Sequence, residues 1–326
     1  MKMFRKAVRI LKATVGITSN HEPHLPGLPF PLEVKSLHTD FKEVEELSWD
    51  HGPFDATISI EESQQPTVFD RTGDSIRFSG PLTSLEAEAT DLRFGFWGNQ
   101  GLLYRFVLSL LEKKHGIYNL HACALFDEEN DRLYVVMGGA GSGKTVYLLS
   151  GLEKDLTLFS TETVHFQIRG ADISWFKGSL ADNVRLGNLM VNFPRFLPEG
   201  PTPATEKAWQ KKIALDLSSY QTGSDIIKNP DVFFILPHIE EGRKGFISDP
   251  ITERQNSAKA VFDNLSSKIA ESFVLYDHVP VLGFDEEGLA RRRLEAATIL
   301  VSHFSIQSII SVLSNPYECW GNLLDQ

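Results

Sequence analysis

Apolar and polar positions follow different spacings along the chain, and the first of these spacings is helical. Phe4, Val8, Leu11 and Val15 recur every three to four residues, and every charged residue before position 17 is basic. This pattern predicts an amphipathic basic helix. Such a helix is compatible with peripheral membrane contact through residues 1–15, but one short basic face binds membranes weakly. Packing against its own domain is therefore the favoured interpretation.

Between residues 54 and 97 the pattern changes to short β-branched and aromatic segments, which predict a small β-rich region. The segment 21–31 before it contains four prolines and is typical of an extended linker. The expected strands are Ala56–Ile60, Thr67–Phe69, Ser75–Phe78 and Leu85–Phe96, with a hairpin turn over Arg71–Asp74.

A helix and a hairpin follow this β-rich region. Apolar residues on one face predict a helix over Gly101–Lys114, which Gly116 ends. Two apolar strands, His121–Phe126 and Leu133–Met137, flank a polar turn and predict a β-hairpin. This hairpin runs directly into a glycine-rich segment, whereas ordinary phosphate-binding loops follow a strand of a parallel sheet with helical crossovers.

The glycine-rich segment is a complete G-x-x-x-x-G-K-[ST] phosphate-binding loop between a strand and a helix. Glycines let successive backbone N–H groups turn toward an anion, and the helix that follows adds its positive N-terminus. In this motif Lys144 reaches the β- and γ-phosphates and the Thr145 hydroxyl ligates Mg²⁺. The expected nucleotide-binding residues are Gly138, Gly139, Ala140, Gly141, Ser142, Gly143, Lys144 and Thr145.

Charge and cysteine content narrow the class of protein. A net charge of −11 argues against broad nucleic-acid binding, which requires a basic surface. The two cysteines, Cys123 and Cys319, lie far apart and predict neither a disulfide framework nor a metal site. No apolar run is long enough for a membrane span, and no signal peptide is visible. These features predict a cytoplasmic protein.

The order of elements around the loop resembles the HPr kinase/phosphorylase-related kinases. A Leu-His-Ala strand at 120–122, a turn, an apolar strand, the phosphate loop and a nearby acidic motif carry the resemblance. It covers residues 101–176 well and 231–265 faintly. It implies a mixed-sheet α/β kinase core, similar to that of phosphoenolpyruvate carboxykinase, over residues 99–326. Residues 1–98 then form the amphipathic segment and the small β-rich region.

The resemblance also implies roles for single residues. His121 matches a histidine beside the transferred phosphate. The family places two adjacent acids after the next strand, and here those positions hold Thr161 and Glu162. Glu162 is expected near the Mg²⁺, whereas Thr161 replaces the acid that acts as general base. Arg243 is a candidate phosphate clamp, because its planar guanidinium matches phosphate oxygens.

Three further segments carry weaker expectations. Asp277 and Asp285 each end an apolar strand, as a Walker B carboxylate does. Val191–Thr205 is dense in proline, which predicts a long loop that borders an acceptor site or is a surface excursion. The apolar stretch Glu287–Leu313 predicts helices in the core or at a subunit contact of a homo-oligomer.

The sequence therefore predicts an ATP- and Mg²⁺-dependent kinase that phosphorylates a hydroxyl of a small molecule or peptide, with His121 assisting at the acceptor. Thr161 leaves a second interpretation open, a degenerate kinase that binds nucleotide as a regulatory protein. A third is an NTPase that drives a partner, which predicts hydrolysis without an acceptor.

Overall fold

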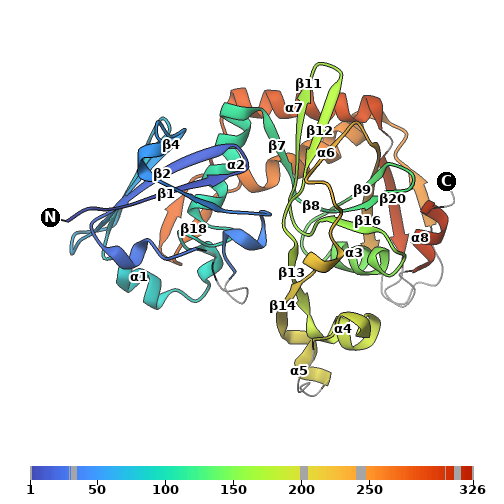
Figure 1. Ribbon diagram of the computed structural model, residues 1–326, viewed down its shortest axis with the longest axis horizontal. Helices are drawn as coiled ribbons and strands as arrows, with labels where there is room; N and C mark the ends of the chain where they lie inside the picture. Colours follow the sequence, from blue (N-terminus) through green and yellow to red (C-terminus); the bar gives the residue numbers. More distant parts are fainter. Residues whose placement is uncertain are drawn as a thin grey trace. The chain divides into compact units, whose positions relative to one another are not determined.

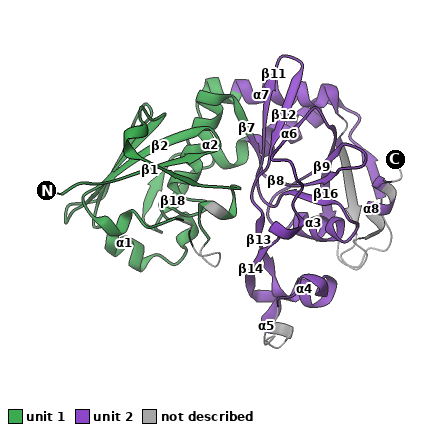
Figure 2. Cartoon of the chain, viewed as in Figure 1, with its two compact units in different colours: residues 1–118, 266–290 green, residues 119–265, 291–326 purple. Residues whose placement is uncertain are grey.

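The computed structural model describes residues 2–28, 30, 35–198, 205–239, 247–304, 306–311 and 317–324. The chain forms two compact units (Figure 2). Unit 1 comprises residues 1–118 and 266–290, and unit 2 comprises residues 119–265 and 291–326. This division differs from the boundary expected after residue 98, because the helix at 102–115 and the segment 266–290 belong to unit 1.

Unit 1 is built on a six-stranded sheet with the order β3-β1-β2-β4-β6-β5 (Figure 1). The β1–β2 and β5–β6 pairs are antiparallel, whereas β2–β4 and β4–β6 are parallel. The strands are β1 (Phe4–Ile10), β2 (Ala13–Ser19), β3 (Glu45–Leu47), β4 (Ala56–Glu62), β5 (Val68–Thr72) and β6 (Ser75–Gly80), and a separate hairpin joins β18 (Phe273–Leu275) to β19 (Val279–Val281).

Helix α2 (Leu102–His115) confirms the predicted helix of this region and forms the core of unit 1, with Leu102–Glu112 buried. Gly116 adopts a left-handed conformation (φ 61°) and ends the helix as expected. The predicted strands at 56–60 and 75–78 and the hairpin turn between β5 and β6 are also confirmed.

The predicted basic helix at the N-terminus is wrong. Residues 4–19 form the antiparallel hairpin β1–β2, in which the apolar residues face the core. Val8, Ile10, Val15 and Ile17 are β-branched, and such side chains favour strands. Lys6 pairs with Glu46 of β3 over 2.8 Å rather than forming part of a basic helical face.

Two further expectations for unit 1 are corrected. The segment 85–96 is not a strand, because helix α1 (Leu82–Glu88) and a 3-10 helix (Leu92–Phe94) occupy it. The proline-rich linker contains a 3-10 helix (Glu22–His24), and its His24 is buried with Nε2 2.8 Å from the Glu62 carboxylate. The remaining 3-10 helices are Leu37–Thr39 and Trp49–His51.

Unit 2 contains a mixed six-stranded sheet with the order β10-β8-β9-β16-β20-β17 (Figure 1). The β8–β9 hairpin is antiparallel, as predicted, and β9, β16 and β20 run parallel. The strands are β8 (Ala122–Asp127), β9 (Arg132–Met137), β10 (Thr157–Ser160), β16 (Asp231–Ile239), β17 (Ile247–Pro250) and β20 (Ile306–Ser311). The strand β20 corrects the all-helical expectation for 287–313, since among the described residues of that stretch α7 (Glu287–His303) is the helix and Ile306–Ser311 is a strand.

Helix α3 (Lys144–Leu152) follows the glycine-rich segment and packs against β8, β9 and the C-terminal helix α8 (Tyr317–Leu324). The buried indole of Trp320 fixes this contact, because its Nε1–H donates to Tyr147 O over 3.1 Å and to Ser150 Oγ over 3.0 Å. The phosphate loop therefore leads into a helix that packs against the sheet and against α8.

A smaller sheet and an arm complete unit 2. The sheet has the order β15-β12-β11-β7, with β15 (Ile226–Lys228), β12 (Asp172–Phe176), β11 (Val164–Arg169) and β7 (Ile117–Leu120). The arm is the antiparallel pair β13 (Ala181–Arg185) and β14 (Lys212–Asp216) with helices α4 (Leu186–Asn192) and α5 (Thr205–Gln210) (Figure 1).

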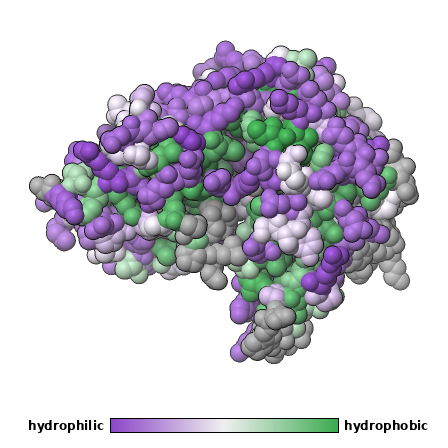
Figure 3. All heavy atoms as spheres, viewed as in Figure 1, coloured by the Kyte–Doolittle hydropathy of each residue, from purple (hydrophilic) through white to green (hydrophobic). Residues whose placement is uncertain are grey.

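The arm corrects the expectation of a structureless segment at 191–205. Helix α4 continues to Asn192 and a 3-10 helix covers Pro194–Phe196. Figure 3 shows apolar surface over this arm, where Val191 is 59% exposed.

Two further helices are α6 (Arg254–Ala270) and a 3-10 helix (Ser218–Tyr220). None of the described helices is long and apolar enough to cross a membrane.

Candidate functional site

The phosphate loop of unit 2 connects the end of β9 to the start of α3. Gly141 and Gly143 have φ angles of 84° and 104°, which side chains with a Cβ rarely adopt. A Cβ on Gly143 would also lie 2.4 Å from Cδ1 of Ile239. Glycine is thus required at Gly143 by both its backbone conformation and the close approach of β16.

The Lys144 side chain folds back over this loop. Its Nζ donates to Gly138 O over 2.6 Å and to Gly139 O over 3.3 Å, and it lies 3.4 Å from Nε2 of His121. The ammonium group thus lies against the loop backbone, next to His121, which connects β7 to β8. His121 is held there because Asn264 Nδ2 donates to its carbonyl oxygen over 3.0 Å.

Asp182 is the residue that sequence reasoning missed. It lies on β13, is 3% exposed, and its Oδ2 accepts a hydrogen bond from Thr145 Oγ1 over 3.1 Å. Thirty-seven residues separate the two partners, and no motif marks Asp182 in the sequence. The strand itself gives no signal, because it also contains Asn183 and Arg185 and does not have an apolar pattern.

Glu162 completes an acidic pair with Asp182. Burial of Asp182, together with the nearby charge of Glu162, raises the pKa of Asp182 to about 7. The Glu162 carboxylate lies 3.7 Å from Nε2 of His121, and its side chain is 32% exposed. The two negative charges repel each other, and a cation bound between them would remove this repulsion.

The acids and the hydroxyl suit Mg²⁺ in number and in type. Among the residues that the structure describes, no three His, Cys, Asp or Glu side chains form a complete metal cluster. Mg²⁺ does not need one, because it is usually held by one or two carboxylates together with substrate phosphates and water. Thr145, Asp182 and Glu162 supply oxygen ligands of that kind.

Thr161 does not occupy the place expected for a general base. Its side chain is 2% exposed, and its Oγ1 donates to Ala181 O over 2.6 Å and to Ser179 O over 3.2 Å. The hydroxyl therefore fastens the end of β10 to the start of β13. Because Asp182 directly follows Ala181, this contact also fixes the strand that presents the buried acid.

Among the described residues, the two Walker B candidates are not part of this cluster. Arg243 lies outside the described residues. Asp277 and Asp285 belong to unit 1, and the Asp277 carboxylate accepts hydrogen bonds from the backbone N–H and the hydroxyl of Thr90, both over 2.6 Å. Asp277 is thus held as a turn residue. The structure brings together His121, Lys144, Thr145 and Glu162, and adds Asp182.

Comparison with models of known protein families found no match for this chain, and comparison with curated proteins found no relative. Function is therefore inferred from the phosphate loop and the side chains around it.

Proposed function

We propose that unit 2 is a P-loop kinase core of the HPr kinase type, which binds ATP with Mg²⁺ and transfers its γ-phosphoryl group to a hydroxyl of a small molecule or peptide. The strand–glycine loop–helix geometry and the mixed sheet support the nucleotide assignment. The observation that carries the proposal is the 3.1 Å contact between Thr145 and the buried Asp182. It joins the loop hydroxyl to an acid, the pair that P-loop NTPases use to hold Mg²⁺.

Each side chain of the cluster has a role in this proposal. Lys144 exchanges its loop carbonyl partners for phosphate oxygens, which are stronger acceptors. Thr145, Asp182 and Glu162 would hold Mg²⁺, which neutralises the charge that develops on the phosphates. A bound cation also favours the charged form of Asp182, whose carboxylate is otherwise costly to bury.

Proton removal from the acceptor falls to His121. Thr161 is engaged with backbone carbonyls and has no acidic group, whereas the His121 imidazole lies between Lys144 and Glu162. The Glu162 carboxylate, 3.7 Å from Nε2 of His121, would stabilise the imidazolium that forms when His121 takes the proton from the acceptor hydroxyl.

The test combines binding and transfer. Calorimetry with ATP should show tight binding that requires Mg²⁺ in the wild type and loses this requirement in Asp182→Asn. The matched control is Asp216→Asn, which changes an exposed acid on the strand paired with β13. Equal Mg²⁺ dependence in all three proteins would reject Asp182 as a ligand.

Transfer is measured with radiolabelled ATP against pools of hydroxyl-bearing metabolites and peptides. Labelled product that is lost in His121→Ala supports the kinase. Nucleotide binding with neither transfer nor hydrolysis would instead identify a regulatory nucleotide-binding protein, and hydrolysis without any acceptor would identify an NTPase.

A further inference from the structure

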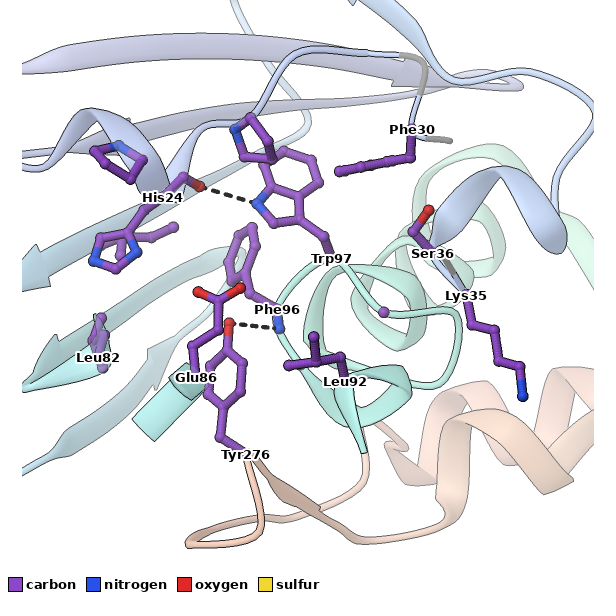
Figure 4. Close-up of a pocket in the computed structure, with 15 residues that line it drawn as sticks. His24, Phe30, Lys35, Ser36, Leu82, Glu86, Leu92, Phe96, Trp97 and Tyr276 are labelled. Atoms are coloured by element: carbon purple, nitrogen blue, oxygen red, sulfur yellow. Dashed lines mark hydrogen bonds between the residues drawn. The ribbon is translucent and has the colours of Figure 1, made fainter. Parts of the chain in front are cut away.

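Unit 1 contains a pocket of about 190 Å³ between the 3-10 helix at 22–24, helix α1 and the hairpin β18–β19. Aromatic and aliphatic side chains form most of its wall (Figure 4). The central members are Phe96, Trp97, Tyr276, Leu82 and Leu92. Pockets for drug-sized molecules range from about 300 to 1,000 Å³, so this one fits a smaller ligand.

The wall residue Tyr276 is held in an unusual backbone conformation. Tyr276 and Asp277 have φ angles of 50° and 63°, which are uncommon for residues other than glycine and most of all for a bulky one. The turn is fixed by Thr90, which binds Asp277, and by Phe96, whose N–H donates to the Tyr276 hydroxyl over 3.0 Å. These contacts hold the Tyr276 side chain in one position in the wall of the pocket.

The charges around the pocket are mostly compensated, with one exception. His24 is paired with Glu62 over 2.8 Å, and Lys35 interacts with the charge of Asp91. Figure 4 shows Lys35 pointing away from the aromatic rings, whereas the Glu86 carboxylate lies beside the Tyr276 hydroxyl and below Phe96. Within the described part of the chain, Glu86 makes no hydrogen bond or ion pair.

The position of Glu86 is fixed by its helix. Leu82 and Glu86 are one turn apart on α1 and both line the pocket. Glu62 anchors the first turn of α1, because it accepts hydrogen bonds from the N–H of Thr83 over 3.0 Å and from its hydroxyl over 2.9 Å. A carboxylate is thus presented to an aromatic wall by a helix whose start is held.

We infer that this pocket binds a small organic ammonium ion with an apolar body, such as a protonated alkyl- or arylalkylamine. The aromatic faces of Trp97, Phe96 and Tyr276 attract a cation and also pack against the apolar part of the ligand. Glu86 supplies the matching negative charge as an acceptor for the ammonium N–H groups. The inference concerns unit 1 alone and does not depend on the proposed kinase activity.

The test is calorimetry of the full chain with three probes of one shape: 2-phenylethylamine, the neutral 2-phenylethanol and the anionic phenylacetate. The amine should bind most tightly and phenylacetate should not bind. Glu86→Gln should weaken amine binding by about tenfold to a hundredfold, because a charge-assisted hydrogen bond is lost, and should leave phenylethanol unchanged.

The matched control is Glu88→Gln, which removes an exposed acid of the same helix that does not line the pocket. Its results with the three probes should match those of the wild type. Because Glu86 is exposed, its variant should melt at the wild-type temperature. The inference is overturned if the amine fails to bind at millimolar concentration, if phenylacetate binds as tightly, or if Glu86→Gln retains wild-type affinity for the amine.

Discussion

The Thr145 hydroxyl and the Asp182 carboxylate are joined by a hydrogen bond of 3.1 Å between the first turn of α3 and strand β13. This contact accounts for an acid that is otherwise expensive to bury, since a buried carboxylate without partners costs several kcal/mol. Thr145 alone does not compensate it, because the pKa of Asp182 remains raised to about 7. In the function proposed above, Mg²⁺ supplies the compensation that Thr145 does not.

The first prediction concerns Lys144. Lys144→Ala should remove most affinity for ATP, since this side chain supplies the positive charge beside the loop, and should leave the melting temperature nearly unchanged. Its hydrogen bonds to Gly138 and Gly139 connect groups at the mouth of the loop and not in the core. Calorimetry and thermal melts test both statements, with the exposed Lys154→Ala as control. Unchanged affinity in Lys144→Ala would contradict the site.

The second prediction uses the pKa of Asp182. The pKa of Asp182 is about 7 in the folded state, whereas its ordinary value is 3.8. Between about pH 4 and pH 7 the carboxyl group is therefore protonated in the folded state and ionised in the unfolded state. Stability therefore falls as pH rises through this window. Asp182→Asn, which cannot ionise, should melt higher than the nucleotide-free wild type at pH 8 and near it at pH 4.

Mg²⁺ and ATP should reverse that order. At pH 8 they should raise the melting temperature of the wild type, because a ligand that binds only the folded state stabilises it, and should raise that of Asp182→Asn far less. If Asp182→Asn melts below the wild type at pH 8 without ligand, the carboxylate is a structural hydrogen-bond partner and not a cation ligand.

Local patterns in the sequence predicted the elements around the phosphate loop. The hairpin β8–β9, the glycine loop and helix α3 each follow from neighbouring residues, so their order could be read directly. The N-terminal hairpin could not, because Phe4, Val8, Leu11 and Val15 match a helical spacing while Leu11 in fact turns the chain with φ 54°. The β-branched residues between them were the better guide.

Only half of the acidic pair could be found in the sequence. Glu162 was found by its spacing from Lys144 in the sequence. Asp182 lies beside Thr145 because β13 pairs with β14 and because Thr161 donates to Ala181 O. Such contacts depend on tertiary structure and leave no local pattern. For the same reason the burial of Thr161 could not be anticipated from its match to the position of a general base.

The third prediction concerns Glu162. Glu162→Gln should lower Mg²⁺-dependent transfer more than binding of nucleotide without metal, because the charge that is removed acts on the cation and on His121. Phosphate transfer measured against Mg²⁺ concentration should show a shift to higher concentration. The control is Glu129→Gln, an exposed acid in the β8–β9 turn. An identical Mg²⁺ dependence in Glu162→Gln would make this residue structural.

The last prediction concerns Thr161 as a positioning residue. Its hydroxyl donates to two backbone carbonyls, at Ser179 and Ala181. Both carbonyls also accept from another donor, the Thr161 N–H and the Ser179 hydroxyl, so Thr161→Val should cost about 0.5–1.5 kcal/mol of stability, the net contribution of one hydrogen bond. Thr161→Ser keeps the donor and should stay close to the wild type. Thr161→Asp should not restore a catalytic base, because a carboxylate placed against two carbonyl oxygens is repelled by them.

A readout beyond stability separates positioning from packing. If Thr161 holds β13 so that Asp182 meets Thr145, then Thr161→Val should require more Mg²⁺ for ATP binding while its metal-free affinity for nucleotide stays near that of the wild type. Thr161→Ser should show the wild-type Mg²⁺ requirement, which attributes the effect to the hydroxyl. Loss of stability in Thr161→Val with no change in Mg²⁺ requirement would mean that Thr161 has only a structural role, the connection of two strands. A rise in phosphate transfer in Thr161→Asp would instead return it to the role of a missing base.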